Sequence, residues 1–240
     1  MVDNNRKLSV APKHLALIPD GNRRWSKSHR LSLSNGYESG IKKFVDFSIW
    51  LRGFGASTVT VWALSTENIK NRSGTELSVL YRLYKKASYD KDIISKLEKN
   101  DTKVVVTGEL DKIPSGVRKA LKHIEQITSK NKSFTINLLI AYGGRDDILH
   151  AVKDIVKAKA TNKIKQINES IIEKYMISSA IPNPDLIIRT SGEFRTSGFL
   201  PWQSSYSELY FSKKYWPDFN IRDLKTAIKD YSYRQRRYGK

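Results

Sequence analysis

The stretch His14-Leu-Ala-Leu-Ile-Pro-Asp-Gly-Asn-Arg-Arg-Trp25 decides the fold, because an apolar run ends in it and a polar turn follows at once. The run is apolar at consecutive positions, which is typical of a strand buried on both faces of a parallel sheet. Gly21 and Asn22 tolerate unusual backbone angles, so the chain turns sharply there. Arg23 and Arg24 then open a helix, and the first amides of a helix attract anions. The stretch therefore predicts an anion site at the end of a strand.

Asp20 is the unexpected residue of this turn, because a carboxylate repels a bound anion unless a metal ion lies between them. Mg²⁺ in proteins is usually held by one or two carboxylates together with phosphate oxygens of a substrate. Asp20 beside two arginines thus indicates a Mg²⁺–diphosphate site. A cap for the following helix explains Asp20 equally well, and this stretch alone leaves both interpretations open.

Length and composition favour one α/β domain. The chain has 240 residues, enough for a substantial core, and no Pro- or Gly-rich linker divides it. We expect a polar N-terminal segment over residues 1–13 and a single domain over residues 14–240. Cys is absent, which excludes disulfides and thiolate metal sites. No apolar run reaches the ~18 residues of a membrane span, and residues 1–13 lack the apolar core of a signal peptide, so we expect a cytoplasmic location.

The formal net charge of +19 indicates an anionic partner. Nucleic acid, phosphorylated metabolites and anionic lipid surfaces all suit a basic protein. Much of the excess is Lys scattered over predicted helices, which is typical of a solvated surface. Charge alone therefore does not choose among these partners, and a nucleic-acid binder stays open as an alternative at this point.

Six short apolar and β-branched runs predict strands at residues 14–18, 57–64, 103–107, 134–140, 185–188 and 208–211. Stretches with helical spacing separate most of them, and further helices are expected near residues 115–129, 146–159, 169–178 and 222–236. Strands that alternate with helices predict an α/β fold, with a largely parallel six-stranded sheet flanked by helices. The connection between residues 188 and 208 shows no helical stripe.

Polar residues follow five of the six predicted strands. The carboxyl ends of parallel strands share one edge of the sheet, and ligands bind along that edge. The segments in question are 20–24, 65–68, 108–109, 142–145 and 189–197. Chance would place glycine, hydroxyl or charged groups at one or two of these ends. Five of them together predict an active site.

A second anion site is predicted after the fifth strand. Arg189 and Arg195 offer guanidinium forks that suit diphosphate oxygens, and the Ser197 hydroxyl adds a donor. Glu208 begins the last strand, and with Asp20 it would complete an oxygen-rich Mg²⁺ site. The alternatives are a solvated loop whose arginines pair with a neighbouring glutamate, and an exposed glutamate at the edge of the sheet.

Other common chemistries lack their motifs in this sequence. There is no Gly-x-x-x-x-Gly-Lys-Ser/Thr loop for nucleotide hydrolysis and no Gly-x-Gly-x-x-Gly segment for dinucleotides. No Gly-x-Ser-x-Gly segment is present, and the four histidines show no metal-ligand spacing. Two diphosphate sites with sparse metal ligands are the arrangement that the residues favour.

Six ordered segments resemble the cis-prenyltransferases, a family that includes undecaprenyl diphosphate synthase and dehydrodolichyl diphosphate synthase. The segments are 14–25, 65–68, 142–145, 189–202, 208–211 and 216–219. The resemblance implies an enzyme that adds isopentenyl diphosphate to an allylic prenyl diphosphate, forming a cis double bond and releasing diphosphate. It also implies Mg²⁺ as cofactor and an apolar tunnel for the growing hydrocarbon. The product would be a polyprenyl diphosphate used as a lipid glycosyl carrier.

The resemblance also implies roles for individual residues. The catalytic residues would be Asp20, Asn22 and Ser65, and the metal ligands would be Asp20 and Glu208. The allylic diphosphate would be bound by Gly21, Asn22, Arg23, Arg24, Trp25, Tyr37 and Leu64. The isopentenyl diphosphate would be bound by Arg189, Arg195, Ser197, Arg237 and Gly239. Residues 67–74 would form a mobile lid. No nucleic acid is expected as partner.

The family works as homodimers or heterodimers whose C-terminal Arg-x-Gly motif reaches the neighbouring site, which implies the same role for Arg237 and Gly239. We expect a homodimer. A basic protein with an apolar product also suits peripheral association with a membrane surface.

Three residues depart from the pattern of the family. Tyr37 stands where His is common, Leu33 replaces a basic residue, and Ala141 stands where Asn is frequent. These departures leave open a short-chain or non-head-to-tail condensing enzyme on the same fold. A non-catalytic partner subunit is a further alternative, although such subunits generally lose the Asp or the arginines that this chain retains.

The size of the tunnel is expected to depend on a few bulky residues. The stripes over residues 41–49 and 77–84 are candidates for its walls, but such stripes are more often plain core. From size alone, Tyr81, Tyr84 and Phe134 would shorten the tunnel and hence the product.

Overall fold

The computed structural model describes residues 11–234, in which six strands form one sheet. All neighbouring strands are parallel, and their order across the sheet is β3-β4-β2-β1-β5-β6. The strands are β1 (His14–Ile18), β2 (Thr58–Ser65), β3 (Thr102–Thr107), β4 (Phe134–Tyr142), β5 (Leu186–Arg189) and β6 (Glu208–Phe211). The predicted six-stranded parallel sheet is confirmed, and the strand ends lie within two residues of the predicted ones.

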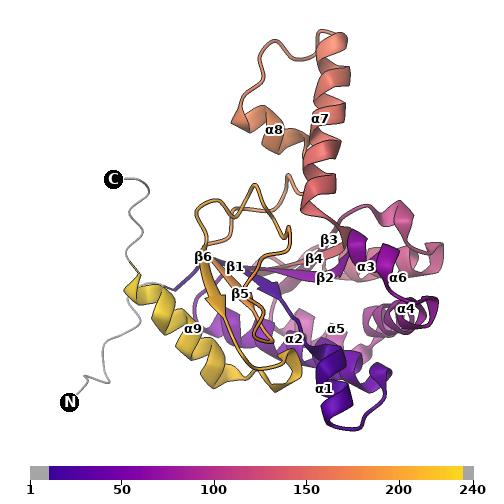
Figure 1. Ribbon diagram of the computed structural model, residues 1–240, viewed down its shortest axis with the longest axis vertical. Coiled ribbons are helices and arrows are strands. Elements are labelled where there is room, and N and C mark those ends of the chain that lie inside the picture. The colour runs from indigo at the N-terminus through magenta and orange to yellow at the C-terminus, as the bar shows by residue number, and fades with distance from the viewer. Residues whose placement is uncertain (1–10, 235–240) are drawn as a thin grey trace.

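Helices connect most of the strands (Figure 1). The α-helices are α1 (Asn22–Ser28), α2 (Leu33–Gly53), α3 (Thr66–Asn71), α4 (Gly74–Tyr89), α5 (Lys91–Lys99), α6 (Ser115–Thr128), α7 (Gly144–Ala160), α8 (Glu169–Tyr175) and α9 (Ile221–Tyr233). Two short 3-10 turns are η1 (Leu110–Lys112) and η2 (Trp216–Asp218). As expected, the connection between β5 and β6 contains no helix. Within residues 11–234, none of the helices has both the length and the apolar character needed to cross a membrane.

β1 pairs with β2 on one side and with β5 on the other, and both of its faces are covered. Leu15 and Leu17 pack in one apolar cluster with residues of α2 and α9, whereas Ala16 and Ile18 pack in another with the β5–β6 connection. Figure 1 shows α2 and α9 below the sheet, and α7 and α8 extending away above it. Burial on both faces explains why the run is apolar at every position rather than alternating.

α8 is shorter than the helix expected over residues 169–178. It ends at Tyr175, and the residues that follow bind the buried Asp147 of α7 instead of continuing the helix. The Asp147 carboxylate accepts hydrogen bonds from the Ile177 amide at 2.7 Å and from the Ser178 hydroxyl. The same carboxylate accepts the Tyr142 hydroxyl at 3.0 Å. One carboxylate therefore fixes the start of α7 against β4 and the approach to β5.

Candidate active site

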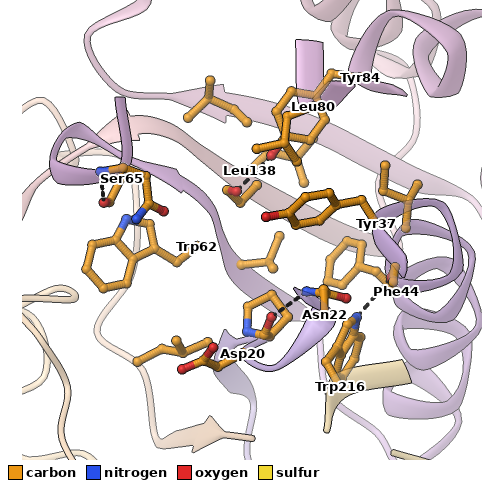
Figure 2. A pocket seen from close by; sticks show the side chains of 18 of the residues that line it. Asp20, Asn22, Tyr37, Phe44, Trp62, Ser65, Leu80, Tyr84, Leu138 and Trp216 are labelled. Atoms are coloured by element: carbon orange, nitrogen blue, oxygen red, sulfur yellow. Dashed lines mark hydrogen bonds between the residues drawn. The ribbon is translucent and has the colours of Figure 1, made fainter. Parts of the chain in front are cut away.

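The carboxyl ends of β1, β2 and β5 open into one cavity of about 840 Å³ (Figure 2). The polar part of its lining consists mainly of residues at the strand ends and in the segments that follow them: Asp20, Asn22, Arg23, Ser65, Glu67, Asn68, Arg72, Arg145, Arg189, Arg195 and Ser197, with Ser88 of α4 in addition. Segments far apart in the sequence thus meet at the edge where the strand ends predict a ligand site.

The turn after β1 is held by contacts with two other segments. Its carbonyl at Asp20 accepts the Thr190 hydroxyl at 2.7 Å and the Trp216 amide at 3.0 Å. Gly21 has φ of 102°, in the left-handed region, and a Cβ there would lie 2.7 Å from the Tyr215 ring and 3.0 Å from the Ser191 hydroxyl oxygen. Only Gly fits this close approach without strain.

Asp20 is not a helix cap. The N-cap of α1 is Gly21, and no side chain caps this helix. One oxygen of Asp20 accepts the Gly21 amide at 2.7 Å, and the other accepts the Arg189 guanidinium at 3.0 Å. The helix-cap interpretation is therefore wrong, and the carboxylate instead faces the arginines of the second predicted anion site.

Arg189 joins the two predicted anion sites into one. Its side chain is largely buried and donates to Asp20, to the Ser197 hydroxyl at 2.9 Å and to the Arg195 carbonyl at 2.6 Å. The polar loop after β5 is thereby folded against the turn after β1. Two segments that were predicted to bind anions, and that lie 169 residues apart in the sequence, thus share one hydrogen-bonded centre.

A second carboxylate lies among these arginines. Glu193 accepts Arg24 at 2.8 Å and Arg195 at 2.6 Å, and Arg24 also lies 3.6 Å from Asp20. Hydrogen bonds from the two arginines hold the pKa of Glu193 below its usual range. Glu193 is therefore ionised and is linked to Asp20 through Arg24. From the sequence, Glu193 is expected only as a partner of the arginines in its own loop, because the long stretch of chain that separates it from Asp20 gives no sign of this link.

Glu208 is not brought to Asp20 within one chain. In the sheet register it lies beside Leu186, whereas Arg189, at the edge that bears the site, lies beside Phe211. These two ends of β6 are about 10 Å apart at ~3.3 Å per residue. The Glu208 carboxylate binds Arg234 at 2.8 Å. Within one chain the described structure therefore does not bring Glu208 beside Asp20, and the assignment of both residues as Mg²⁺ ligands stays a prediction.

Asn22 and Ser65 both line the cavity, as expected. The Asn22 amide nitrogen donates to the Pro19 carbonyl at 2.9 Å, while its side-chain oxygen is buried without a hydrogen-bond partner among the described residues. The Ser65 hydroxyl accepts the Asn68 amide at 2.9 Å and so caps α3. Figure 2 shows the two side chains on different sides of the cavity.

Tyr37 lines the cavity and belongs to a hydrogen-bonded cluster that the sequence does not reveal. Its hydroxyl donates to Glu76 at 2.5 Å, and the same carboxylate pairs with Arg72 at 3.1 Å and Arg23 at 3.3 Å. Burial raises the pKa of Tyr37, so the hydroxyl keeps its proton and can donate. Glu76 was missed because Ser73-x-x-Glu76 is the usual pattern of a helix start.

Two predicted cavity residues lie elsewhere. Trp25 donates to the Asp218 carboxylate at 2.7 Å and stacks on His29, with ring centroids 4.5 Å apart. Leu64 is buried in the apolar cluster beneath α4. Neither residue borders the cavity, so their predicted contact with the allylic substrate is not supported. Gly21 and Arg24 do not line the cavity themselves, but both contact Asp20, which does. Arg237 and Gly239 lie outside the described residues.

Away from the arginines, the cavity is apolar. Its wall includes Ile41, Phe44 and Val45 of α2, Leu80 and Tyr84 of α4, and Val61, Ile136, Leu138 and Ile140 of the sheet. Figure 2 shows Asp20 at one side of the view and Leu80 and Tyr84 at the other, with Tyr37 between them. The cavity is consistent with the predicted tunnel. Tyr81 and Phe134 do not line it.

An apolar cavity with arginines at its mouth suits a substrate that has a charged diphosphate head and a hydrocarbon tail. This is the class of substrate that prenyltransferases use. Residues 18–239 match the model of the protein family described as putative undecaprenyl diphosphate synthase. The chain belongs to this family and is a prenyltransferase.

Named relatives agree with the family. The chain is 42% identical over 231 residues to a tritrans,polycis-undecaprenyl-diphosphate synthase (GGDP specific) of Sulfolobus acidocaldarius, covering 95% of this chain and 88% of the relative. It is 40% identical over 233 residues to the geranylgeranyl-diphosphate-specific enzyme of Methanocaldococcus jannaschii, covering 95% and 83%.

Solved structures share the fold. Lavandulyl diphosphate synthase from Lavandula x intermedia, in complex with dimethylallyl diphosphate, matches with a TM-score of 0.91 and 31% identity, covering 96% of this chain and 99% of that one. A probable undecaprenyl diphosphate synthase from Campylobacter jejuni matches with a TM-score of 0.78 and 29% identity, covering 96% and 100%.

Proposed function

We propose that this protein is a Mg²⁺-dependent cis-prenyltransferase that extends geranylgeranyl diphosphate with isopentenyl diphosphate to a cis-polyprenyl diphosphate, the precursor of a lipid glycosyl carrier. The hydrogen-bonded centre of Asp20, Arg189 and Ser197 at the mouth of one apolar cavity carries the proposal. The choice of primer rests on the names of the relatives, which are specific for geranylgeranyl diphosphate.

The residues at the mouth fit a Mg²⁺ ion that is shared with a substrate. Asp20 presents a partly exposed carboxylate beside Arg189, and Glu193 adds a second one through Arg24. Mg²⁺ usually keeps one or two protein carboxylates and takes its other oxygens from phosphates and water. When bound, the ion would stabilise the negative charge that develops on the departing diphosphate.

The chain's own residues would contribute by orienting the two substrates and by stabilising the negative charge of the leaving group. The bond between the allylic carbon and its diphosphate oxygen breaks, and the electron pair leaves with diphosphate. The double bond of the isopentenyl unit attacks that carbon, and the unit then gives a proton to the released diphosphate as the new double bond forms. Arginines at the mouth offset the charge on the leaving group. Asn22 and Ser65 are proposed to orient the isopentenyl unit, which turns a bimolecular collision into an oriented step.

We further propose that the enzyme works as a homodimer. Three apolar residues lie one or two turns apart on α7 and are largely exposed: Leu149 at 50%, Val152 at 49% and Val156 at 61%. Such a stripe is typical of a helix that packs against a partner. Sedimentation of the full chain and of Val156→Glu tests this, since a monomeric wild-type protein would contradict it. Peripheral association with a membrane surface is also proposed, from the net charge of +19 and the apolar product.

The function is tested by incubating the purified protein with labelled isopentenyl diphosphate, Mg²⁺ and a series of allylic primers. We expect the highest incorporation with geranylgeranyl diphosphate and, after dephosphorylation, a ladder of long products on chromatography. Chelation of Mg²⁺ should abolish incorporation and its return should restore it. No incorporation with any primer would contradict the enzyme proposal and favour a non-catalytic partner subunit.

A short-chain enzyme is the second candidate, because lavandulyl diphosphate synthase has the same fold with a TM-score of 0.91. The same assay distinguishes the two. A single condensation product formed from dimethylallyl diphosphate would favour the short-chain enzyme, and a ladder of long products would exclude it.

A further inference from the structure

Five arginines line the mouth of the cavity, and four of them are already paired with carboxylates. They are Arg23, Arg72, Arg145, Arg189 and Arg195. Glu76 holds two of them, Asp20 holds a third and Glu193 a fourth. Arg145 differs, because within residues 11–234 it has no ion pair and no hydrogen bond from its side chain. Its guanidinium is thus available to an anion without first leaving a carboxylate.

The backbone of Arg145 is fixed although its side chain is exposed. Arg145 is the second residue of α7, and the amide of the preceding Gly144 donates to the Gly198 carbonyl at 3.2 Å. A Cβ on Gly144 would lie 2.2 Å from that carbonyl oxygen and 2.2 Å from Pro201, so the two segments touch closely. Two residues further along, the buried Asp147 anchors the same turn of the helix. These contacts fix the backbone at the start of α7, including that of Arg145.

The fixed start of α7 places Arg145 beside the loop that carries the second predicted anion site. Gly198 directly follows Ser197, whose hydroxyl accepts Arg189, and both Ser197 and Gly198 line the cavity together with Arg145. The turn after β1, by contrast, accepts hydrogen bonds from Thr190 and from Trp216 of η2. Arg145 thus belongs to the β5 side of the mouth.

We propose that Arg145 binds the diphosphate of the isopentenyl substrate. The proposal rests on the proposed function, which places that substrate at Arg189, Arg195 and Ser197. An arginine fork binds two phosphate oxygens at once, and an unpaired one gives up no existing ion pair to do so. Arg145 should therefore contribute mainly to capture of the isopentenyl substrate and little to binding of the allylic one.

Steady-state kinetics of the full chain with each substrate varied in turn tests the proposal. Arg145→Ala should raise KM for isopentenyl diphosphate by about tenfold to a hundredfold, as expected for loss of a hydrogen bond to a charged group. KM for the allylic diphosphate should stay within about twofold. Arg145→Lys should recover part of the loss, because it keeps the charge and loses the fork. The matched control is Arg118→Ala, an exposed arginine of α6 that does not line the cavity, which should change neither KM.

Two outcomes would overturn the proposal. One is an Arg145→Ala enzyme with an unchanged KM for isopentenyl diphosphate. The other is an equal rise in both KM values together with a lower melting temperature, which would indicate a structural role.

Calorimetry with inorganic diphosphate separates this proposal from the proposed function. If the wild-type protein makes no prenyl product but binds diphosphate more tightly than Arg145→Ala does, the result supports the anion site and contradicts the proposed function. Equal binding by both proteins would overturn the anion site itself.

Discussion

At the residue scale, Asp20 balances an excess of positive charge. It accepts Arg189 at 3.0 Å and lies 3.6 Å from Arg24, and Glu193 binds the other side of Arg24. Without these carboxylates the arginines would repel one another in the absence of substrate. With them, the guanidinium groups are held at the mouth in fixed positions, where a substrate diphosphate can contact them.

Replacing Asp20 by Asn tests its proposed metal role. Asparagine has the same shape and still accepts the Gly21 amide, but it lacks the charge that a Mg²⁺ ion needs. We expect kcat to fall by about 10²–10³-fold, the usual loss when one group that stabilises transition-state charge is removed, with an unchanged circular dichroism spectrum. Asp154→Asn on the exposed face of α7 is the control and should retain full turnover. Near-normal turnover of Asp20→Asn would refute the metal role.

At the element scale, α2 supports the active site through a glycine. Gly40 packs so close to the turn after β1 that a Cβ would lie 2.3 Å from the Asn22 side-chain oxygen and 3.2 Å from the Trp216 ring. The Gly40 carbonyl also accepts the Trp216 indole at 2.9 Å. The helix therefore positions Asn22 through direct contact.

Gly40→Ala should displace Asn22 and lower kcat by up to about a hundredfold, since small misplacements of a positioning group are costly. The same helix offers a matched control, because a Cβ on Gly53 meets nothing within 4 Å. Gly53→Ala should leave turnover unchanged and stabilise the protein by up to about 1 kcal/mol. Turnover and chemical denaturation of the two variants check this, and equal turnover of both would contradict the role of Gly40.

α4 is tied to β2 at an irregular point of the sheet. The register of β2 with β4 shifts between Trp62 and Leu64, and the carbonyl of the intervening Ala63 accepts the Tyr84 hydroxyl at 2.7 Å. Desolvation raises the pKa of Tyr84, so this hydroxyl stays protonated as a donor. Because Tyr84 also lines the cavity, its ring occupies space that a hydrocarbon chain would otherwise fill.

Tyr84→Ala should therefore lengthen the prenyl products. Tyr81→Ala on the same helix is the control and should leave their length unchanged, because Tyr81 does not line the cavity. Tyr84→Phe keeps the ring and should alter stability by about 1 kcal/mol, for one lost hydrogen bond, but not length. Chromatography of the dephosphorylated products measures their length. Identical lengths for Tyr84→Ala and the wild type would contradict the role of the Tyr84 ring.

At the scale of the whole molecule, a polar chain crosses the middle of the sheet. The His14 ring nitrogen Nε2 lies 2.8 Å from the Thr60 hydroxyl, which also accepts the Asn137 amide at 3.1 Å. All three residues are buried, on β1, β2 and β4. Burial lowers the pKa of His14 from its usual value of 6.5 to about 4, because the charged ring would lose its hydration.

This buried histidine should make the fold sensitive to acid. A lowered pKa in the folded state means that stability is complete above pH ~6.5 and is lost as the pH falls toward about 4, where the unfolded chain binds the proton more readily. Between pH 7.5 and 4.5 the loss should be about 2–3 kcal/mol. Urea denaturation at both pH values measures it. His14→Gln should reduce the pH dependence by this amount, whereas the exposed His29→Gln should not; equal pH dependence in all three proteins would contradict the role of His14.

Sequence alone predicted the strands and most helices because burial leaves a periodic pattern. A strand covered on both faces is apolar at each position, and a helix on the sheet repeats its apolar residues every three to four positions. The polar segments after the strands were predictable for the same reason, since parallel topology collects strand ends at one edge. Asp20, Asn22, Ser65, Arg189, Arg195 and Ser197 therefore gather at the mouth of the cavity as expected.

What sequence alone determined about this protein is its family, its sheet and the edge that holds its site, because these depend on local patterns and ordered motifs. Tertiary structure alone decided which side chains meet there. Glu208 lies at the far end of its strand, Trp25 turns outward to Asp218, and Glu76 of α4 pairs with Arg23 and Arg72 of the cavity lining. The physical reason is that side-chain contacts depend on strand register, helix rotation and close packing between distant segments, and none of these leaves a local mark on the sequence.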